Sequence, residues 1–364
     1  MARIASYRDF DWFMLGVVLL ISAIGTVQIY SASLTNTKLG LMHDKQLMWL
    51  GVGLVAMFIL SAIDYHKLLE NVHWAYIVMF LALCAVPVVG YTALGAKRWI
   101  KIPGIGLFQP SEWMKLVLVI ALAQFASTLN PRNVTWKDVA KAGAMVLIPF
   151  ALVLKQPDLG TSLTYLPALA VLLFLAGMKP KHIAIIALVG LLMAPVAWHK
   201  LKPYQKARLT SFIHPEDDPK GSGYQVQQSL IAVGSGGIWG KGMAKGSQTQ
   251  GNFLPVTHTD FIFAAFSEEH GFVGAALILL LYFVLLMRLI QNAQTAGDRA
   301  GTMLIMGVAA ILTFHVLVNV GMVLGMMPVT GIPLPLMSYG GSSVMFTFLA
   351  LGIVMNVRMR RFVN

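Results

Sequence analysis

The sequence contains few charged residues. Asp, Glu, Lys and Arg together make up 12% of its 364 residues, whereas hydrophobic residues make up 57%. Soluble globular domains carry about 25% charged residues, so this composition excludes a soluble domain. We therefore expect a polytopic membrane protein.

Cysteine is almost absent. The single cysteine, Cys84, lies within an apolar run. One thiol can form neither an intramolecular disulfide framework nor a cysteine-based metal site. A disulfide-stabilised scaffold and a cysteine-ligated zinc module are therefore both excluded.

Acidic residues are also scarce. The chain has 15 Asp and Glu against 27 Lys and Arg, which gives a formal net charge of +12 at pH 7. The basic residues are dispersed and belong to no recognisable nucleic-acid-binding module, so nucleic acid is not an expected partner. Anchoring to anionic lipid at the cytoplasmic face explains part of the surplus. The remainder is predicted to lie outside, which indicates an anionic ligand that approaches from the outer face.

Hydrophobic runs of membrane-spanning length occupy most of the chain. The uncharged run from Trp12 to Tyr30 is too long for the core of a signal peptide, so we expect a retained helix. The predicted fold is all-α, a single integral membrane domain over residues 1–364 with ten transmembrane helices. The ten segments are 12–33, 46–63, 74–91, 112–129, 139–155, 161–178, 182–199, 259–287, 302–323 and 341–357.

The distribution of lysine and arginine predicts the orientation. With the N-terminus inside, the inner segments hold thirteen of these residues and the short outer loops hold six. This bias follows the positive-inside rule and places both termini in the cytoplasm. The large outer loop, 200–258, joins helices 7 and 8 and adds seven positive charges outside, but long loops escape the rule.

Asp260 stands where a polar loop meets an apolar run. A carboxylate at such a boundary is either an end-anchor that faces headgroups or a functional group that needs both an aqueous and a lipid-borne partner. His258 and Thr259 precede it, and Ser267, Glu268 and Glu269 follow it. So many polar side chains at one helix entry favour a functional site.

Glu112 and Lys115 open the fourth predicted helix. Ser111 is a suitable N-cap and Glu112 suits the positive end of the helix dipole, which is the structural interpretation. It leaves Lys115 unexplained, because a lysine one turn into a membrane helix is costly unless it is paired or solvated. We favour a functional pair over a purely structural one.

Two outer loops carry further candidates. In the loop before the fourth helix, Trp99, Ile100 and Ile102 lie among Lys97, Arg98 and Lys101, which makes an amphipathic patch suited to an interface. The short connection after the fifth helix contains Lys155 and Asp158. Asp158 is either an ordinary turn residue or a site residue, and its proximity to Lys155 at the outer face favours the site.

The outer loop 200–258 divides into two parts. Residues 200–214 have the mixed basic and apolar pattern of an interfacial helix. The rest is rich in glycine around a short helix predicted at 225–233, and such a segment can re-enter the bundle and place backbone N–H groups against an anion. It is not a P-loop, because Ser235 and Gly242 stand where glycine and a hydroxyl residue are required.

The ninth helix carries His315 and Asn319 on one face. A buried pair that hydrogen-bonds neighbouring helices is the favoured interpretation, and a role in the site is the alternative. The segment that follows, 328–343, is uncharged and rich in proline and glycine. Non-helical backbone at this depth is tolerated only where it is buried or lines a cavity.

These stretches together resemble the SEDS family, the shape, elongation, division and sporulation proteins, over nearly the whole chain. The elongation branch is the better match, because Thr330 stands where the division branch usually has lysine. One departure is Val256, where the family commonly has glutamate, so no catalytic duty is expected there. The matching motifs are 95–99 (GAKRW), 109–112 (QPSE), 156–162 (QPDLGTS), 258–263 (HTDFIF) with Glu268 and Glu269, and 333–342 (PLPLMSYGGS).

The resemblance implies a peptidoglycan glycosyltransferase that polymerises lipid II at the outer face of the cytoplasmic membrane. It also implies a class B penicillin-binding protein, a transpeptidase, as partner, within a complex of other elongation membrane proteins. The catalytic aspartate of the family matches Asp260. Its glutamate and lysine at the start of the fourth helix match Glu112 and Lys115.

A mechanism follows for an inverting transfer. We expect Asp260 to take the proton of the incoming hydroxyl while Lys115, Arg98 or Lys155 neutralises the departing pyrophosphate, with or without a divalent cation (Mg²⁺ or Mn²⁺). Asp260 is the possible ligand of that cation. Glu112, Asp158, His258 and Ser338 are further candidates for substrate binding. The rival functions are a lipid II flippase, which would need charged or broken helices near the midplane, and a non-catalytic scaffold.

Overall fold

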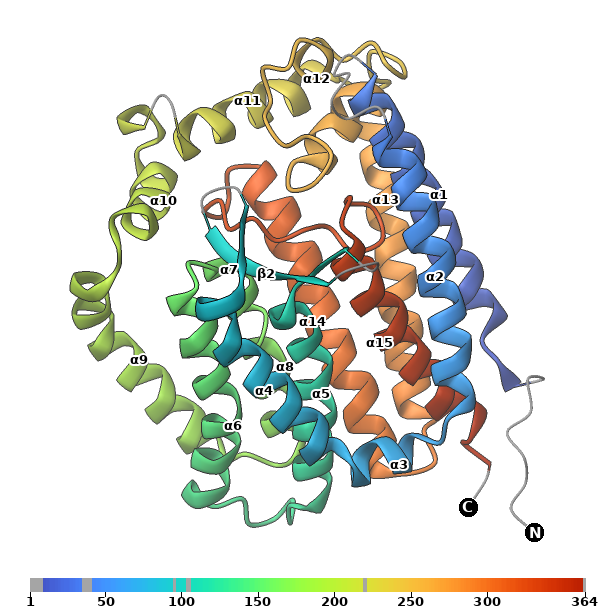
Figure 1. Cartoon of the computed structure of the whole chain (residues 1–364), viewed down its shortest axis with the longest axis vertical. Coiled ribbons are helices and arrows are strands. Elements are labelled where there is room, and N and C mark those ends of the chain that lie inside the picture. The colour runs from blue at the N-terminus through green and yellow to red at the C-terminus, as the bar shows by residue number, and fades with distance from the viewer. Residues whose placement is uncertain (1–8, 35–40, 94–95, 103–105, 219–220, 363–364) are drawn as a thin grey trace.

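The computed structural model describes residues 9–34, 41–93, 96–102, 106–218 and 221–362 (Figure 1). Its helices are α1 (Trp12–Ser33), α2 (Met42–Ala62), α3 (Tyr65–Glu70), α4 (Val72–Val89), α5 (Pro110–Thr128), α6 (Trp136–Lys155), α7 (Leu159–Leu163), α8 (Leu166–Leu175), α9 (Pro180–Lys200), α10 (Pro203–Ile213), α11 (Ser222–Ser235), α12 (Ser247–Gln250), α13 (Ile262–Gln294), α14 (Arg299–Val323) and α15 (Gly341–Met359). A 3-10 turn, Pro215–Asp217, lies between α10 and α11.

Nine of the ten predicted segments each fall on one of these helices, and the tenth falls on two. Within the described ranges, six helices are long and apolar enough to cross a membrane: α1, α2, α4, α13, α14 and α15. The segment predicted at 161–178 is divided between α7 and α8, because Pro167 supplies no N–H donor for a continuous helix. The helices predicted within the outer loop are also present, as α10 and α11.

The centre of the bundle is formed by α14 and α15. In their apolar stretches 67% and 72% of the residues are buried, against 17% for α4. Most of α5 is also buried, from Pro110 to Ala123, with Trp113 half-buried. The more peripheral helices expose their apolar side chains, as expected for surfaces that face lipid.

One end of the bundle gathers both ends of the described chain. Arg361 lies 3.4 Å from the carboxylate of Asp9, and Arg299 donates hydrogen bonds to the carbonyls of Leu129 and Ala176. The loops after α5, α8 and α13 therefore meet at the end of the bundle that holds α3 in Figure 1.

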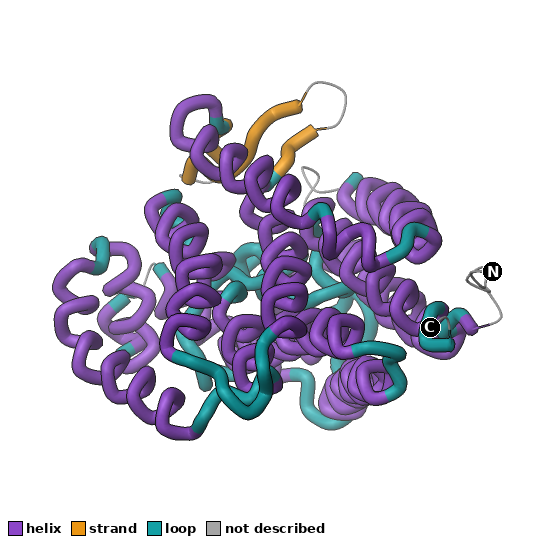
Figure 2. Tube along the Cα trace, turned by 90° about the horizontal axis from the view of Figure 1, so that it is seen from below, coloured by secondary structure: helices purple, strands orange, loops and turns teal. Residues whose placement is uncertain are grey.

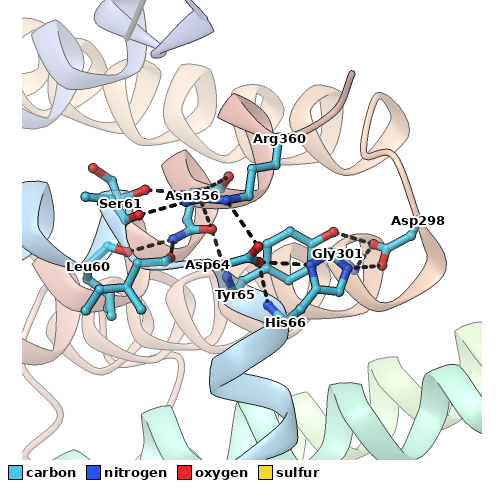
Figure 3. Close-up of polar contacts among 11 residues, drawn as sticks. Leu60, Ser61, Asp64, Tyr65, His66, Asp298, Gly301, Asn356 and Arg360 are labelled. Carbon is cyan, nitrogen blue, oxygen red and sulfur yellow. Dashed lines mark hydrogen bonds and ion pairs between the residues drawn. The ribbon is translucent and has the colours of Figure 1, made fainter. Parts of the chain in front are cut away.

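Polar contacts around α3 stabilise this end (Figure 3). The Tyr65 hydroxyl donates to Asp298 Oδ1 at 2.8 Å, and the two ring nitrogens of His66 face Asp64 and Asp298 at 2.9 and 3.1 Å. Asn356 on α15 accepts a hydrogen bond from the backbone N–H of Tyr65 at 3.1 Å. These contacts join α3, α14 and α15.

The opposite end contains α10 to α12 and a small antiparallel sheet that the all-α prediction missed. Its strands are β1 (Tyr91–Ala93), β2 (Ala96–Ile102) and β3 (Gly106–Phe108), in the order β1-β2-β3. Tyr91 pairs with Trp99, and Ile100 pairs with Phe108. The basic and apolar residues that predicted an interfacial segment in this loop therefore belong to a strand, β2. The strands lie together at the edge of the bundle in Figure 2.

A sharp bend divides α13 at Gly271. Its φ of +67° is left-handed, and a Cβ there would lie 2.3 Å from the backbone nitrogen of Gly240. Glycine is therefore required for both the conformation and the close approach. The N–H groups of Phe272 and Val273 donate to the carbonyls of Gly237 and Ile238 at 2.8 and 3.1 Å, so the turn after α11 docks against the bend.

Candidate active site

Asp260 lies in the loop that leads into α13, at the end of the bundle that holds the sheet. The side-chain amide of Asn319 on α14 donates to the carbonyl of Asp260 at 2.9 Å and to the carbonyl of Ile332 at 2.8 Å. A Cβ at Gly331 would lie 3.3 Å from Asp260 Oδ2, so the loop after α14 closely approaches the carboxylate. Asn319 thus positions both loops, whereas the predicted hydrogen bonds to neighbouring helices are not the ones its amide nitrogen makes.

The two loops are also joined through Ser338. Its hydroxyl donates to the carbonyl of Thr259 at 2.7 Å and accepts from the N–H of Leu334 at 2.8 Å. The N–H of Tyr339 donates to the carbonyl of His258 at 2.9 Å, and the His258 and Tyr339 rings lie edge to face. Ser338 is buried, so in this conformation it positions the loop that carries Asp260.

The positive charges of two arginines act on the carboxylate of Asp260. Arg98 comes from β2 and Arg208 from α10, and Arg208 Nη1 donates to the carbonyl of Thr330 at 3.0 Å. Desolvation raises the pKa of Asp260 from its ordinary 3.8 to about 6, while the positive charges of Arg208 and Arg98 oppose this rise. A carboxylate whose pKa lies near 6 is well suited to act as a general base near neutral pH.

Asp158 contacts Arg98 and also caps a helix. Its carboxylate accepts from the N–H of Thr161 at the start of α7 at 3.2 Å and from Gln109 Nε2 at 3.2 Å. Arg98 Nη1 lies 3.5 Å from Asp158 Oδ1, and Arg98 also donates to the carbonyl of Pro157. Asp158 is therefore the N-cap of α7, as the turn interpretation expects, and its carboxylate also holds Arg98 in place.

Glu112 and Lys115 form a buried ion pair on α5. Lys115 Nζ lies 2.7 Å from Glu112 Oε2, and the two side chains are 0% and 6% exposed. Lys115 Nζ also lies 3.3 Å from His315 Nε2 and 4.3 Å from the centre of the Phe346 ring. His315 Nδ1 lies 3.1 Å from the carbonyl of Pro333, so Nδ1 carries the proton and Nε2 accepts from the ammonium.

This environment limits what Lys115 can contact. Its charge is balanced by Glu112, and no part of its side chain is exposed. Contact with a pyrophosphate therefore requires a rearrangement of the pair. In the described conformation the pair contacts His315, and His315 in turn contacts the carbonyl of Pro333 in the 328–339 loop. The pair therefore helps to hold this loop in place.

Lys155 is the predicted site residue that the structure does not bring into these contacts. It is the last residue of α6 and is exposed to solvent. Arg208, by contrast, was missed. The basic character of residues 200–214 was the available signal, but that pattern does not distinguish Arg208 from its basic neighbours. Gly95, which belongs to one of the family motifs, lies outside the described residues.

Glu268 and Glu269 have structural partners. Glu268 is fully buried, pairs with Lys241 at 2.8 Å, and accepts from the N–H groups of Gln248 and Thr249 at 2.8 and 3.0 Å. Glu269 accepts from the Ser31 hydroxyl at 2.7 Å. Glu268 attaches α12 and the loop before it to α13, and Glu269 joins α13 to α1, so part of the polar cluster that favoured a catalytic role is structural.

Few carboxylates lie where they could hold a divalent cation at the site. Among the described residues, no group of three or more His, Cys, Asp or Glu could hold a metal ion. Asp260 and Asp158 are the two carboxylates of the site that act on one another. Magnesium is commonly held by one or two carboxylates together with substrate phosphates.

Comparisons with known proteins cover almost the entire chain. A family model described as "Cell cycle protein", named for FtsW, RodA and SpoVE, matches residues 11–362. The chain is 38% identical over 361 residues to stage V sporulation protein E of Bacillus subtilis, covering 95% of this chain and 96% of that protein. It is 37% identical over 353 residues to peptidoglycan glycosyltransferase MrdB of Escherichia coli, covering 96% and 94%.

Solved structures agree with this similarity. One, described as "Structural coordination of polymerization and crosslinking by a peptidoglycan synthase complex", matches with a TM-score of 0.83 at 34% identity, covering 98% of this chain and 99% of that chain. The crystal structure of the rod shape determining protein RodA of Thermus thermophilus matches with a TM-score of 0.73 at 31% identity and 98% coverage of both chains.

Proposed function

The chain belongs to the FtsW, RodA and SpoVE family of multi-pass membrane proteins and is a peptidoglycan glycosyltransferase, and we propose that it polymerises lipid II into β-1,4-linked glycan strands. The observation that carries this proposal is the environment of Asp260. One carboxylate with a pKa of about 6 lies in the field of Arg98 and Arg208. This arrangement combines a base with counter-charges for an anionic leaving group.

The reaction inverts the configuration at the donor sugar. Lipid II carries an α-linked pyrophosphate, so a β-linkage results when the acceptor 4-hydroxyl attacks C1 from the opposite face. Asp260 takes the hydroxyl proton as the new C1–O bond forms, and the bond from C1 to the pyrophosphate breaks with its electron pair on oxygen. Asn319 and Ser338 hold the backbone of Asp260 and Thr259 in place during this step.

Positive charge stabilises the departing pyrophosphate. Arg98 and Arg208 approach Asp260 from two extramembrane elements, β2 and α10, and are the main counter-charges of the proposed mechanism. Lys115 would join them only after its pair with Glu112 rearranges. Asp260 and Asp158 would hold a divalent cation, Mg²⁺ or Mn²⁺, which would supply further neutralisation of the pyrophosphate when bound.

The proposed orientation places the site outside the cell. In this orientation the helices found at the ten predicted segments cross the bacterial cytoplasmic membrane, with the end that joins Asp9 to Arg361 in the cytoplasm. The loop 200–258, the sheet and Asp260 then face the outer side. The polyprenyl tail of the substrate can remain in lipid while its sugars reach the 258–260 loop.

The proposed cellular role is elongation, with a class B penicillin-binding protein as the transpeptidase partner and other elongation membrane proteins in the complex. Thr330 before Gly331 and the similarity to MrdB and RodA support this role. The similarity to the sporulation protein is of the same order. The match to a structure described as a peptidoglycan synthase complex supports a cross-linking partner.

Purified protein incubated with lipid II tests the proposed activity. We expect glycan chains on gels, with Asp260→Asn as the inactive control. Reactions with added Mg²⁺ or Mn²⁺ are compared with reactions that contain a chelator, which tests the need for the cation. Translocation of lipid II without chains would instead establish a flippase. If neither glycan chains nor translocation is observed in the presence of a transpeptidase partner, the remaining function is that of a scaffold.

A further inference from the structure

An apolar groove lies between α8 and α9, away from Asp260. Its volume is about 540 Å³, and its lining includes Leu169, Leu173 and Phe174 from α8 and Ile183 and Ile186 from α9. The helix α9 lies at the edge of the bundle in Figure 1 and exposes most of its apolar side chains. The groove is therefore open to the hydrocarbon of the membrane.

A cluster of cations lies where the groove meets the turn between α8 and α9. We call this cluster the basic foot of the groove, and its residues are Arg132, Lys137, Lys141, Lys179 and Lys181. Met178 and Ile183 line the groove, and Lys179 and Lys181, which lie between them in the sequence, are exposed. The loop before α6 lies against the same turn, since a Cβ at Gly177 would approach the carbonyl of Pro131 to 2.2 Å. Arg132 in that loop and Lys137 and Lys141 at the start of α6 add three exposed cations.

The cations of this foot are only partly balanced. The nearby carboxylate of Asp138 accepts from the hydroxyl and the N–H of Thr135 in a capping box at the start of α6. Trp136 is 44% exposed, and its ring lies 4.4 Å from that of His182 on α9. An exposed tryptophan among lysines is typical of the boundary between headgroups and hydrocarbon.

We infer that this groove and its basic foot bind an anionic phospholipid of the inner leaflet, with acyl chain in the groove and phosphate against the lysines. Basic pockets between transmembrane helices on the cytoplasmic side are suited to acidic headgroups. The position of the foot at the end that joins Asp9 to Arg361 assigns the inner leaflet in the proposed orientation. The lipid would also fill the space beside α9, the helix that leads into α10 and Arg208.

The substrate tail fits the groove less well. Tyr165, just before α8, donates to the carbonyl of Ser111 near the candidate active site, whereas the lysines follow the other end of α8. Ten helical residues, Leu166–Leu175, span about 15 Å at 1.5 Å per residue. The pyrophosphate of a polyprenyl substrate bound at Asp260 is therefore far from the basic foot.

Photolabelling of the purified full-length protein tests the site. The protein is placed in phosphatidylcholine nanodiscs that contain phosphatidylglycerol with a diazirine in one acyl chain, and labelled peptides are mapped by mass spectrometry. We expect labels within 166–187. Lys179→Gln with Lys181→Gln should reduce them by about fivefold or more, since one lysine near an anionic surface contributes about a factor of five in affinity. Ala187→Trp, which fills the groove without changing charge, should reduce them as well.

Lys67→Gln is the matched control. Lys67 is an exposed cation of α3 at the same end of the bundle, and its loss should leave labelling of 166–187 unchanged. Equal labelling by a phosphatidylcholine probe would overturn the preference for anionic lipid. Displacement of the label by a polyprenyl pyrophosphate would assign the groove to the substrate tail, and absence of label from 166–187 would remove the site. None of these outcomes depends on polymerisation activity.

Discussion

Asn319 donates a 2.9 Å hydrogen bond to the carbonyl of Asp260, which lies 59 residues earlier in the chain. The same amide nitrogen holds the carbonyl of Ile332. A residue in the middle of the bundle therefore fixes the two loops between which the catalytic carboxylate of the proposed mechanism lies.

Asn319→Ala should lower kcat more than it raises KM. It leaves two carbonyls without their donor and lets Asp260 shift, and a misplacement of about 1 Å can cost about 10²-fold in rate. Steady-state polymerisation kinetics measure the change. Asn319→Asp, which has no amide donor, should behave like the alanine variant. A wild-type kcat in both variants would contradict the positioning role.

Asp260→Asn should abolish most polymerisation while lipid II still binds. Loss of a general base alone costs about 10²–10⁴-fold in rate. Asp260→Glu should recover little, because the added methylene displaces the carboxylate. Glycan synthesis and lipid II binding are measured on the same preparations. Near wild-type synthesis by Asp260→Asn would exclude this residue as the base.

The Asp260→Asn substitution should not destabilise the folded protein at neutral pH. The pKa of Asp260 is raised from 3.8 to about 6, so the folded state holds the proton more tightly than the unfolded state does. The contribution of this residue to stability therefore falls as pH rises through that window. Asn carries no charge to desolvate, and we expect its Tm to equal or exceed that of the parent at pH 7. A clearly lower Tm would show that the carboxylate has a structural role.

Polymerisation should increase as pH rises through about 6, because the base must be ionised. Arg208→Gln removes a positive charge that lowers the pKa of Asp260, so the acidic limb of the rate profile should move to higher pH. Lys206→Gln is the matched control, since it removes a charge from the same helix and should leave the limb in place. An unmoved limb in Arg208→Gln would mean that Arg208 does not act on Asp260.

Variants of the Glu112 and Lys115 pair can distinguish a role in the stability of the fold from a role in the reaction. Lys115→Met leaves Glu112 buried without its partner, and such a break costs about 3–5 kcal/mol. We expect a lower Tm in this variant and recovery of the Tm when Glu112→Gln is added. If the double variant regains both Tm and polymerisation, the pair is structural. If it regains only the Tm, one of the two charges serves the reaction.

Thiol labelling tests the proposed orientation. In a Cys84→Ser background, a membrane-impermeant reagent applied to spheroplasts should modify Ser235→Cys, at the end of α11, and should not modify Asn133→Cys, in the loop before α6. Both positions are exposed. The opposite pattern would place Asp260 on the cytoplasmic side.

Helices were predictable because a membrane imposes long apolar runs, and every predicted segment falls on a helix. The sheet was not, since residues 97–102 mix basic and apolar side chains without the two-residue period that would distinguish a strand from an interfacial segment. The catalytic candidate Asp260 was identified from its place at a boundary and from the family motif. The contacts of Asn319 and Arg208 depend on tertiary packing, which local sequence patterns do not encode.

The bend at Gly271 also constrains the order of assembly. In its bent form, α13 has no carbonyl of its own that accepts from the N–H groups of Phe272 and Val273. The carbonyls of Gly237 and Ile238 accept these hydrogen bonds instead. During biogenesis a straight α13 can form as soon as its residues leave the ribosome. The bent form, however, becomes stable only after the turn between α11 and α12 has reached the same end of the bundle and docked there.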